Sequence, residues 1–185
     1  VFYEGSPRYV SPHMASVIIQ KISCMVTTVG LFVNAPSLEV REIVAQTGID
    51  LIQYHGDEDP ADCSNGSRRW IKAIRVRREG DVAKAEKKYH EASALLLDSW
   101  NSRVYGGTGE TFDWKKIPQR PSKPFILAGG LDPTNIRRAI RETKPFAVDV
   151  SGGIELERGI KDPDKMRAFI EEIESSKEDD KPNET

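Results

Sequence analysis

The chain has 185 residues, with 27 lysines and arginines against 29 acids and a formal net charge of −2, and its length suits one domain. This near balance of charge argues against a protein that binds nucleic acid or an anionic membrane. Cys24 and Cys63 have neither metal-type spacing nor a disulfide framework, and no apolar run reaches the roughly 20 residues that span a bilayer, so we predict a reduced, cytoplasmic protein.

Short apolar runs alternate with helical patterns along the chain. In chain order they predict a strand stub at 1–3, a helix at 11–22, a strand at 28–34, a helix at 37–48, a strand at 51–56, a short helix within 57–69, a strand at 70–76, a helix at 81–92, a strand at 94–100, a helical turn at 113–117, a strand at 124–130, a helix at 132–144, a strand at 146–153 and a helix at 162–174. The signals that mark helix ends are Ser11 with Pro12, Ser37, Asp132 with Pro133 and Asp162 with Pro163 at starts, and Gly48 at a stop.

The order of these elements predicts an α/β fold with a parallel sheet. Nearly every strand is followed by a helix, and the strands are continuous apolar runs, as in sheets that helices cover on both faces. Either an open doubly wound sheet or an eight-stranded barrel has this order. The barrel needs one more βα unit and most of the second strand, and the chain starts where those would end. We therefore predict a (β/α)8 TIM barrel over 1–174 that is incomplete at its N-terminus, followed by a disordered charged tail over 175–185.

A barrel without its first strand exposes strand edges that pair readily, so we expect a monomer or a homodimer.

In such barrels the working residues follow the carboxyl ends of the strands. In this chain the polar and glycine residues at those positions are residues 3–8, Asn34, His55 with Gly56, Arg75 with Arg77, Asp98 with Ser99, Gly129 with Gly130, and residues 149–153. Two Gly-Gly pairs, in LAGGL and VDVSGGIE, follow the last two predicted strands, where a sugar phosphate is usually held by backbone N–H groups. A glycine after a strand is alternatively only a turn.

Three side chains at these positions are candidates for chemistry. Asp98 ends the apolar run LLLDS, so it is either a loop-capping aspartate or a carboxyl group that serves as general acid in a closed pocket. His55 either binds substrate or satisfies a neighbouring loop. Arg8 either pairs with a carboxylate or phosphate or is an ordinary surface arginine. The glycine-rich segment 105–114 is either a linker or a lid.

These motifs together resemble one family. GSPRYVSP, VGLFVN, IQYHG, LLLDS with GGTGETFDW, FILAGGL, and FAVDVSGGIE with GIKD, in this order over about 1–173, resemble the phosphoribosylanthranilate isomerases of tryptophan biosynthesis. The resemblance implies a TIM barrel without a cofactor or metal, whose partner is a small-molecule substrate, phosphoribosylanthranilate. The implied reaction is an Amadori rearrangement of this aminoaldose to 1-(2-carboxyphenylamino)-1-deoxyribulose 5-phosphate.

The resemblance also assigns roles to residues. Asp98 matches the general acid, Arg8 the arginine that faces the anthranilate carboxylate, and His55 the histidine that lines the pocket. The phosphate-binding backbone matches Gly129, Gly130, Ser151 and Gly152, with Asp149 beside them.

One role in the family's mechanism has no match in this sequence. The family's general base is a cysteine at the end of the first strand, and neither Cys24 nor Cys63 follows a predicted strand. Both cysteines are interpreted as small, partly buried apolar residues. We therefore expect little isomerase turnover from residues 1–185 alone. The alternative is a non-catalytic relative that binds a phosphorylated ribose or serves in an assembly. A third hypothesis is another sugar-phosphate enzyme, such as a pentose-phosphate epimerase, but the metal-ligand clusters typical of it are not seen.

Overall fold

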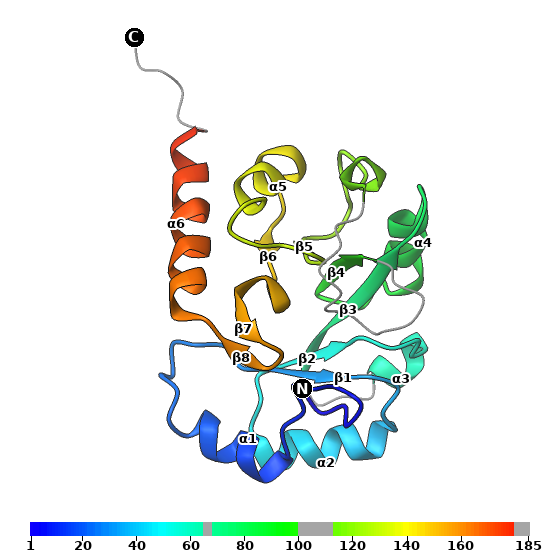
Figure 1. Ribbon diagram of the computed structural model, residues 1–185. Coiled ribbons are helices and arrows are strands. Elements are labelled where there is room, and N and C mark those ends of the chain that lie inside the picture. The colour runs from blue at the N-terminus through cyan, green and yellow to red at the C-terminus, as the bar shows by residue number, and fades with distance from the viewer. Residues whose placement is uncertain (65–67, 100–112, 180–185) are drawn as a thin grey trace. The chain divides into compact units, whose positions relative to one another are not determined.

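The computed structural model describes residues 1–64, 68–99 and 113–179 of the chain (Figure 1). The chain forms two compact units: Val1–Ile74 with Lys84–Leu96, and Arg75–Ala83 with Leu97–Thr185. Each unit is taken by itself below.

All six full strands predicted from the sequence are confirmed. They are β1 Val29–Phe32, β2 Leu51–Tyr54, β3 Arg69–Val76, β4 Ala94–Ser99, β5 Phe125–Leu127 and β6 Ala147–Val148. They are hydrogen-bonded in the order β1-β2-β3-β4-β5-β6, and the pairs β1–β2, β2–β3 and β5–β6 are parallel. The predicted α/β class with a parallel sheet is therefore confirmed. The stub at 1–3 is not assigned as a strand, although the Phe2 N–H donates to the Leu31 carbonyl at 2.9 Å.

The helices also follow the predicted order. They are α1 Pro12–Ile19, α2 Ser37–Thr47, α3 Pro60–Ser64, α4 Asp81–Lys88, α5 Ile136–Thr143 and α6 Pro163–Asp179, with short 3-10 helices η1 Trp114–Lys116 and η2 Gly152–Ile154. An antiparallel hairpin of β7 Glu155–Glu157 and β8 Ile160–Lys161, which the sequence did not predict, lies between η2 and α6. None of the helices in the described part of the chain is long and apolar enough to cross a membrane.

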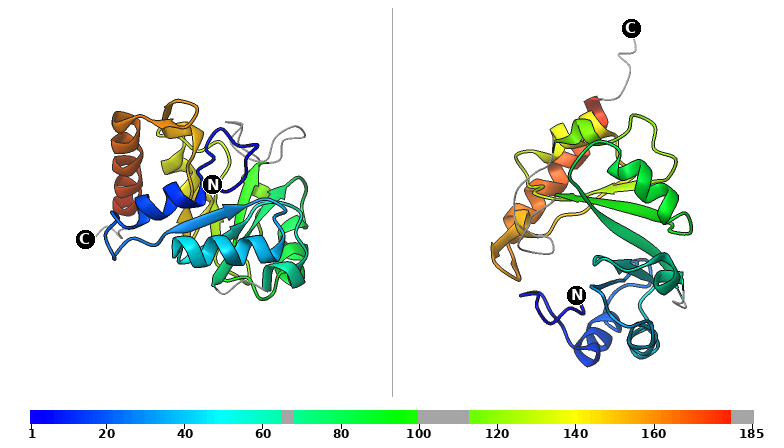
Figure 2. Two further views of the ribbon diagram at one scale, coloured as in Figure 1. Left: turned by 90° about the horizontal axis from the view of Figure 1, so that it is seen from below. Right: turned by 90° about the vertical axis from the view of Figure 1, so that its right-hand side faces the viewer.

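In the first unit, α1 and α2 lie side by side below β1 and β2 in the view of Figure 1, and Figure 2 shows the same pair from below. The parallel register places Phe32 of β1 opposite Tyr54 of β2. Phe32 and Val40 of α2 are fully buried, and the Phe2 ring stacks on Phe32 with centroids 5.2 Å apart. Burial of large apolar side chains of this kind stabilises the unit by roughly 1.5–3 kcal/mol each.

In the second unit, α5 and α6 pack against each other (Figure 1). Leu127 of β5 and Ile136 and Ala139 of α5 are fully buried, and Phe169 of α6 is 3% exposed. α6 continues to Asp179, so the prediction of a disordered tail from residue 175 is wrong for its first five residues. The helical pattern of MRAFIEEIE continues into SSKED, whose lysine and glutamate are good helix formers.

The predicted caps were partly right. Ser11 caps α1 by accepting from the Met14 N–H at 3.3 Å, and Asp162 caps α6 by accepting from the Asp164 N–H at 2.9 Å. Gly48 ends α2 with φ 73° in the left-handed region.

Two predicted caps were wrong. Ser37 is the first residue of α2 and Pro36 is its N-cap. Asp132 caps a turn through the Thr134 N–H at 2.7 Å, and α5 begins only at Ile136. The Asn135 side chain accounts for this delay, because it accepts from the Asp132 N–H at 3.1 Å and donates to the Gly130 carbonyl at 2.8 Å. These two bonds fold residues 132–135 back on the preceding loop before the helix starts.

Candidate functional site

The candidate site residues divide between the two units. Arg8 and His55 lie in the first unit, and the second unit contains Asp98 and all the predicted phosphate-binding residues, Gly129, Gly130, Asp149, Ser151 and Gly152. Within the second unit the structure brings the predicted acid and the first Gly-Gly pair together.

Asp98 lies next to the last residue of β4 and its side chain is buried, at 4% exposure. Its Oδ1 accepts from the Ser99 N–H at 2.8 Å. β5 runs beside β4, where the Ala128 N–H donates to the Leu97 carbonyl at 2.8 Å. The next residue, Gly129, therefore comes against the end of β4, where a Cβ atom on it would lie 2.9 Å from Asp98 Oδ1. Only glycine fits this place, since its φ is also +82°.

The two glycine loops lie against each other. The Asp149 N–H donates to the Leu127 carbonyl at 2.8 Å, which aligns the residue after β6 with the end of β5. Further on, a Cβ atom on Gly153 would collide with the Leu131 carbonyl oxygen and lie 2.9 Å from Asp132 Cβ. Gly153 lies in the segment 149–153 that the sequence placed at a strand end, but no phosphate-binding role was assigned to it.

Lys161 supports the second loop and was also missed. Its ammonium donates to the Ser151 carbonyl at 2.8 Å and pairs with Glu155 at 3.0 Å. Ser151 and Gly152 lead into η2, and the Lys161 side chain, which comes from β8, thus holds the backbone at Ser151. The GIKD segment contains this lysine, but only the hairpin shows what it touches.

In the first unit, Arg8 lies in a tight N-terminal loop. The Ser6 N–H donates to the Tyr3 carbonyl at 2.9 Å and the Val10 N–H donates to the Val1 carbonyl at 3.0 Å, so the loop closes on itself. The Arg8 N–H donates to Ser6 Oγ at 3.1 Å, and the side chain is partly exposed. These hydrogen bonds therefore fix the backbone from which the Arg8 side chain extends.

His55 follows β2 and is 8% exposed. Its N–H donates to the Phe32 carbonyl at 2.8 Å, and its Nδ1 lies 3.0 Å from Gln53 Nε2. The Gln53 amide thus contacts one nitrogen of the ring and orients the His55 side chain.

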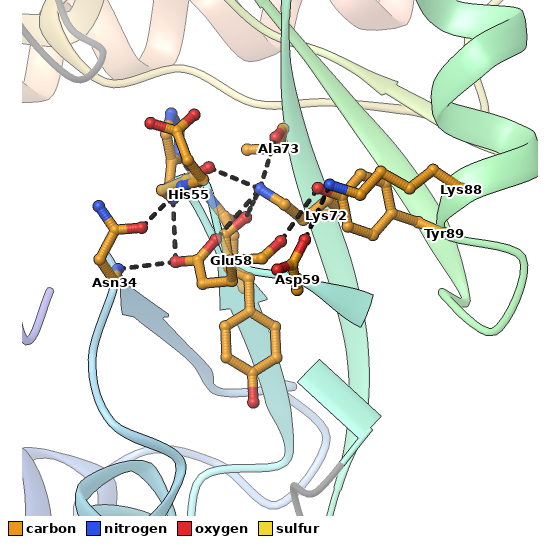
Figure 3. A network of polar contacts seen from close by, with 12 residues as sticks. Asn34, His55, Glu58, Asp59, Lys72, Ala73, Lys88 and Tyr89 are labelled. Carbon is orange, nitrogen blue, oxygen red and sulfur yellow. Dashed lines mark hydrogen bonds and ion pairs between the residues drawn. The ribbon is translucent and has the colours of Figure 1, made fainter. Parts of the chain in front are cut away.

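A polar cluster, in which Glu58 and Lys72 are buried and Asn34 is exposed, holds the loop after β2 (Figure 3). The sequence analysis gave a role to none of these three residues. We call Asn34, Glu58 and Lys72 the loop clamp. Glu58 and Lys72 form an ion pair at 3.2 Å, with side-chain exposures of 3% and 2%. Burial lowers the pKa of Lys72, and the charge of Glu58 opposes that shift. The available signal was a lysine in the middle of the apolar run WIKAIRV.

The two cysteines differ in environment. Cys63, in α3, is fully buried, and burial together with the charge of Glu58 raises the pKa of its thiol to about 12. Cys24 is exposed, which corrects the prediction that both are partly buried. Neither residue belongs to the described strands or follows the end of one, so the structure gives neither the position of a barrel general base.

We expect iodoacetamide at mildly alkaline pH to modify Cys24 and spare Cys63 in the folded chain, because a raised thiol pKa leaves almost no thiolate to react. Peptide mass spectrometry after timed quenching measures both sites. The chain unfolded in urea is the control, in which both cysteines should react alike. Equal rates in the folded chain would show that α3 opens readily.

Most of the predicted lid, 105–114, lies outside the described residues. At its end, Asp113 caps η1 through the Lys115 N–H at 3.1 Å, and the Trp114 ring is buried with the Arg138 guanidinium 5.1 Å from its centroid. Over 1–64, 68–99 and 113–179, no group of three or more His, Cys, Asp or Glu side chains is arranged to hold a metal ion.

The chain matches known proteins along most of its length. A family model described as N-(5'-phosphoribosyl)anthranilate (PRA) isomerase matches residues 1–172. The N-(5'-phosphoribosyl)anthranilate isomerase of Pseudomonas fluorescens Pf-5 is 51% identical over 178 residues, which are 96% of this chain and 85% of that protein. This coverage does not confirm the predicted absence of a first βα unit, which stays a prediction.

Solved structures show the same fold. The crystal structure of phosphoribosyl anthranilate isomerase from Thermotoga maritima has a TM-score of 0.86 at 35% identity, over 94% of this chain and 85% of that one. A phosphoribosyl anthranilate isomerase in complex with reduced 1-(o-carboxyphenylamino)-1-deoxyribulose 5-phosphate has a TM-score of 0.79 at 32% identity, over 94% and 84% of the two chains.

Proposed function

Because the chain belongs to the N-(5'-phosphoribosyl)anthranilate isomerase family, we propose that it isomerises phosphoribosylanthranilate in tryptophan biosynthesis. The reaction is the Amadori rearrangement of the aminoaldose to 1-(2-carboxyphenylamino)-1-deoxyribulose 5-phosphate. A general acid protonates the ribose ring oxygen and opens the ring, and a base removes the proton from C2. The resulting enolamine tautomerises to the ketose, so hydrogen moves within the substrate and the overall reaction needs no external oxidant or reductant.

The position of Asp98 against Gly129 is the observation that carries this proposal. In a ribose 5-phosphate, only C4' and C5' with the ester oxygen separate the ring oxygen from the phosphorus. An acid for the ring oxygen must therefore lie close to the phosphate-binding backbone. Asp98 and the Gly129 and Gly153 loops meet this requirement within one unit of the chain. Glycine at both loops lets backbone N–H groups approach a phosphate without a side chain between them.

The resemblance supports the remaining assignments. We propose that the Arg8 guanidinium pairs with the anthranilate carboxylate, and that the His55 ring, oriented by Gln53, lines the pocket. A protein that only binds a phosphoribosyl ligand has no need of a buried acid beside its phosphate loop, so Asp98 favours the enzyme over the non-catalytic alternative.

The general base is the part of the mechanism that these residues do not supply. The thiol of Cys63 is buried and its raised pKa keeps it protonated, and Cys24 lies in the segment between α1 and β1. Weak turnover by residues 1–185 alone therefore stays a prediction. Comparing the isomerase rate of this purified chain with that of the Pseudomonas fluorescens relative checks it.

Binding of the reduced product analogue tests the proposed function without depending on the base. We expect the 185-residue chain to bind the analogue, and Arg8→Gln to raise the dissociation constant about 10- to 100-fold, since a hydrogen bond to a charged group contributes roughly 1.5–3 kcal/mol. Isothermal titration calorimetry measures both constants. Arg41→Gln, on the exposed side of α2, is the matched control and should bind like the parent.

Each outcome of this titration has a separate meaning. A parent chain that does not bind the analogue would refute the proposed function. Normal binding by Arg8→Gln would keep the function and remove Arg8 from the carboxylate site.

A further inference from the structure

The loop clamp ties the end of β1 to the loop after β2 through Glu58 (Figure 3). Its Oε1 accepts from the Asn34 N–H at 2.8 Å and from the Gly56 N–H at 3.0 Å. The Asn34 side chain adds a hydrogen bond between the same two loops, because its Oδ1 accepts from the Asp57 N–H at 2.7 Å. Asn34 adopts φ +52°, a left-handed conformation that asparagine tolerates better than most residues. Hydrogen bonds therefore run in both directions between the two loops.

Lys72 completes the clamp from β3. Its ammonium donates to the carbonyls of Gly56 at 2.8 Å, Ala73 at 3.1 Å and Tyr54 at 3.3 Å. It also pairs with Glu58 Oε2 at 3.2 Å. Lys72 thus supplies both the counter-charge of Glu58 and a set of donors to the surrounding backbone.

His55 lies between two of the residues that Lys72 holds. The Tyr54 and Gly56 carbonyls flank it on the chain, and its own N–H is bound to the Phe32 carbonyl. The ring is then oriented by Gln53. The position of the His55 backbone therefore depends on the Lys72 ammonium, and the ring orientation follows from that backbone.

We propose that Lys72 and Glu58 are positioning residues that set the place of the His55 backbone, and through it the orientation of the ring toward the substrate. This inference rests on the proposed function for the role of His55. A buried ion pair is weak evidence for stability, because apolar residues of similar volume often do as well or better. What apolar residues cannot supply is the set of donors to the Tyr54 and Gly56 carbonyls. We therefore explain the Lys72–Glu58 ion pair by the hydrogen bonds with which it holds the backbone of the loop after β2.

Two variants test the proposal by separating the Lys72–Glu58 ion pair from the hydrogen bonds that Lys72 donates to the Tyr54 and Gly56 carbonyls. Lys72→Met leaves the Glu58 carboxylate buried without a counter-charge, so we expect a clear fall in melting temperature. Adding Glu58→Gln removes that charge while keeping an oxygen for the Asn34 and Gly56 N–H groups, so the melting temperature should recover in the double variant. The donors to Tyr54 and Gly56 stay absent in both variants. Affinity for the reduced product analogue should therefore stay about 10- to 100-fold below the parent in the double variant.

Two further measurements keep the test independent of turnover. Nitrogen-15 NMR of the imidazole rings should show His55 resonances in the double variant that are displaced from those of the parent. Val40→Ala, at a fully buried position of α2, is the matched control. It should lower the melting temperature but change neither the His55 resonances nor the affinity of the folded protein.

The outcomes distinguish this inference from the proposed function. If the double variant recovers affinity along with stability, or keeps the parent His55 resonances, the clamp is only structural and the inference is overturned. If the parent binds no analogue, the proposed function fails, and the His55 resonances still decide whether Lys72 positions the ring. Glu58→Gln alone provides a second variant if Lys72→Met does not fold, and it should displace the His55 resonances in the same direction.

Discussion

Asp98→Asn is expected to lower the rate of isomerisation by about 10²- to 10⁴-fold, the usual contribution of a general acid. Asparagine has nearly the same size as aspartate. Its side-chain oxygen can still accept the hydrogen bond that the Ser99 N–H donates to Asp98 Oδ1 at 2.8 Å. It has no acidic proton to give to the ribose ring oxygen, so ring opening loses its catalyst while the pocket keeps its shape. Affinity for the reduced product analogue should stay near that of the parent.

Single-turnover kinetics with enzyme in excess measure this effect even when turnover is slow, by following the fluorescence of the anthranilate group. Asp164→Asn in α6, where the side chain is 90% exposed, is the matched control and should react at the parent rate. A parent-like rate for Asp98→Asn would remove Asp98 as the acid. Loss of analogue affinity together with rate would instead indicate that the substitution disturbed the pocket.

Gly129→Ala should impair both turnover and phosphate binding, and it should destabilise the protein. The alanine would adopt φ near +82°, and its Cβ would collide with the Ser99 nitrogen and lie 2.9 Å from Asp98 Oδ1. The left-handed conformation costs roughly 1–2 kcal/mol and overpacking roughly 1–3 kcal/mol, so we expect a total of about 2–5 kcal/mol. Relief of the collision would move the acid or the phosphate loop. Urea unfolding and analogue titration measure the two effects.

Gly48→Ala separates the conformational cost from the collision. Gly48 has a similar φ of +73°, but a Cβ atom there would meet no atom within 4 Å. This variant should lose about 1–2 kcal/mol of stability and bind the analogue normally. If Gly129→Ala behaves like Gly48→Ala, the approach of Gly129 to Asp98 does not matter for function.

The strands could be predicted because they are continuous apolar runs with clear ends. Leu95, Leu96 and Leu97 of β4 are all at most 1% exposed, so the run itself reports burial on both faces of the sheet. The β7–β8 hairpin was missed because strands of three and two residues are too short to show a period. The start of α5 was misplaced because Asp132 and Asn135 are both good caps, and their mutual hydrogen bond decides between them.

The sequence located the strand ends at which the candidate residues lie, while their roles stay a proposal. Asp98 is within β4 and Gly129 follows β5, and their mutual approach follows from the pairing of these two strands. Glu58 and Lys72 were missed because their roles depend on contacts between distant residues. Asn34 and Glu58 are 24 residues apart, and Lys72 and Gly56 are 16 apart. No local pattern gives such contacts, and a lysine within an apolar strand does not name its partner.

The close approach of Gly153 to the Leu131 carbonyl also limits how the gene can change. Every single-base change in a glycine codon that alters the amino acid without ending the chain introduces a Cβ atom, and at this position that atom has no room. At Gly48 a Cβ atom would meet nothing within 4 Å, so the same changes carry only the cost of the left-handed conformation. Selection should thus act strongly on the codon of Gly153, where the two glycine loops meet, and weakly on the codon of Gly48, which ends α2.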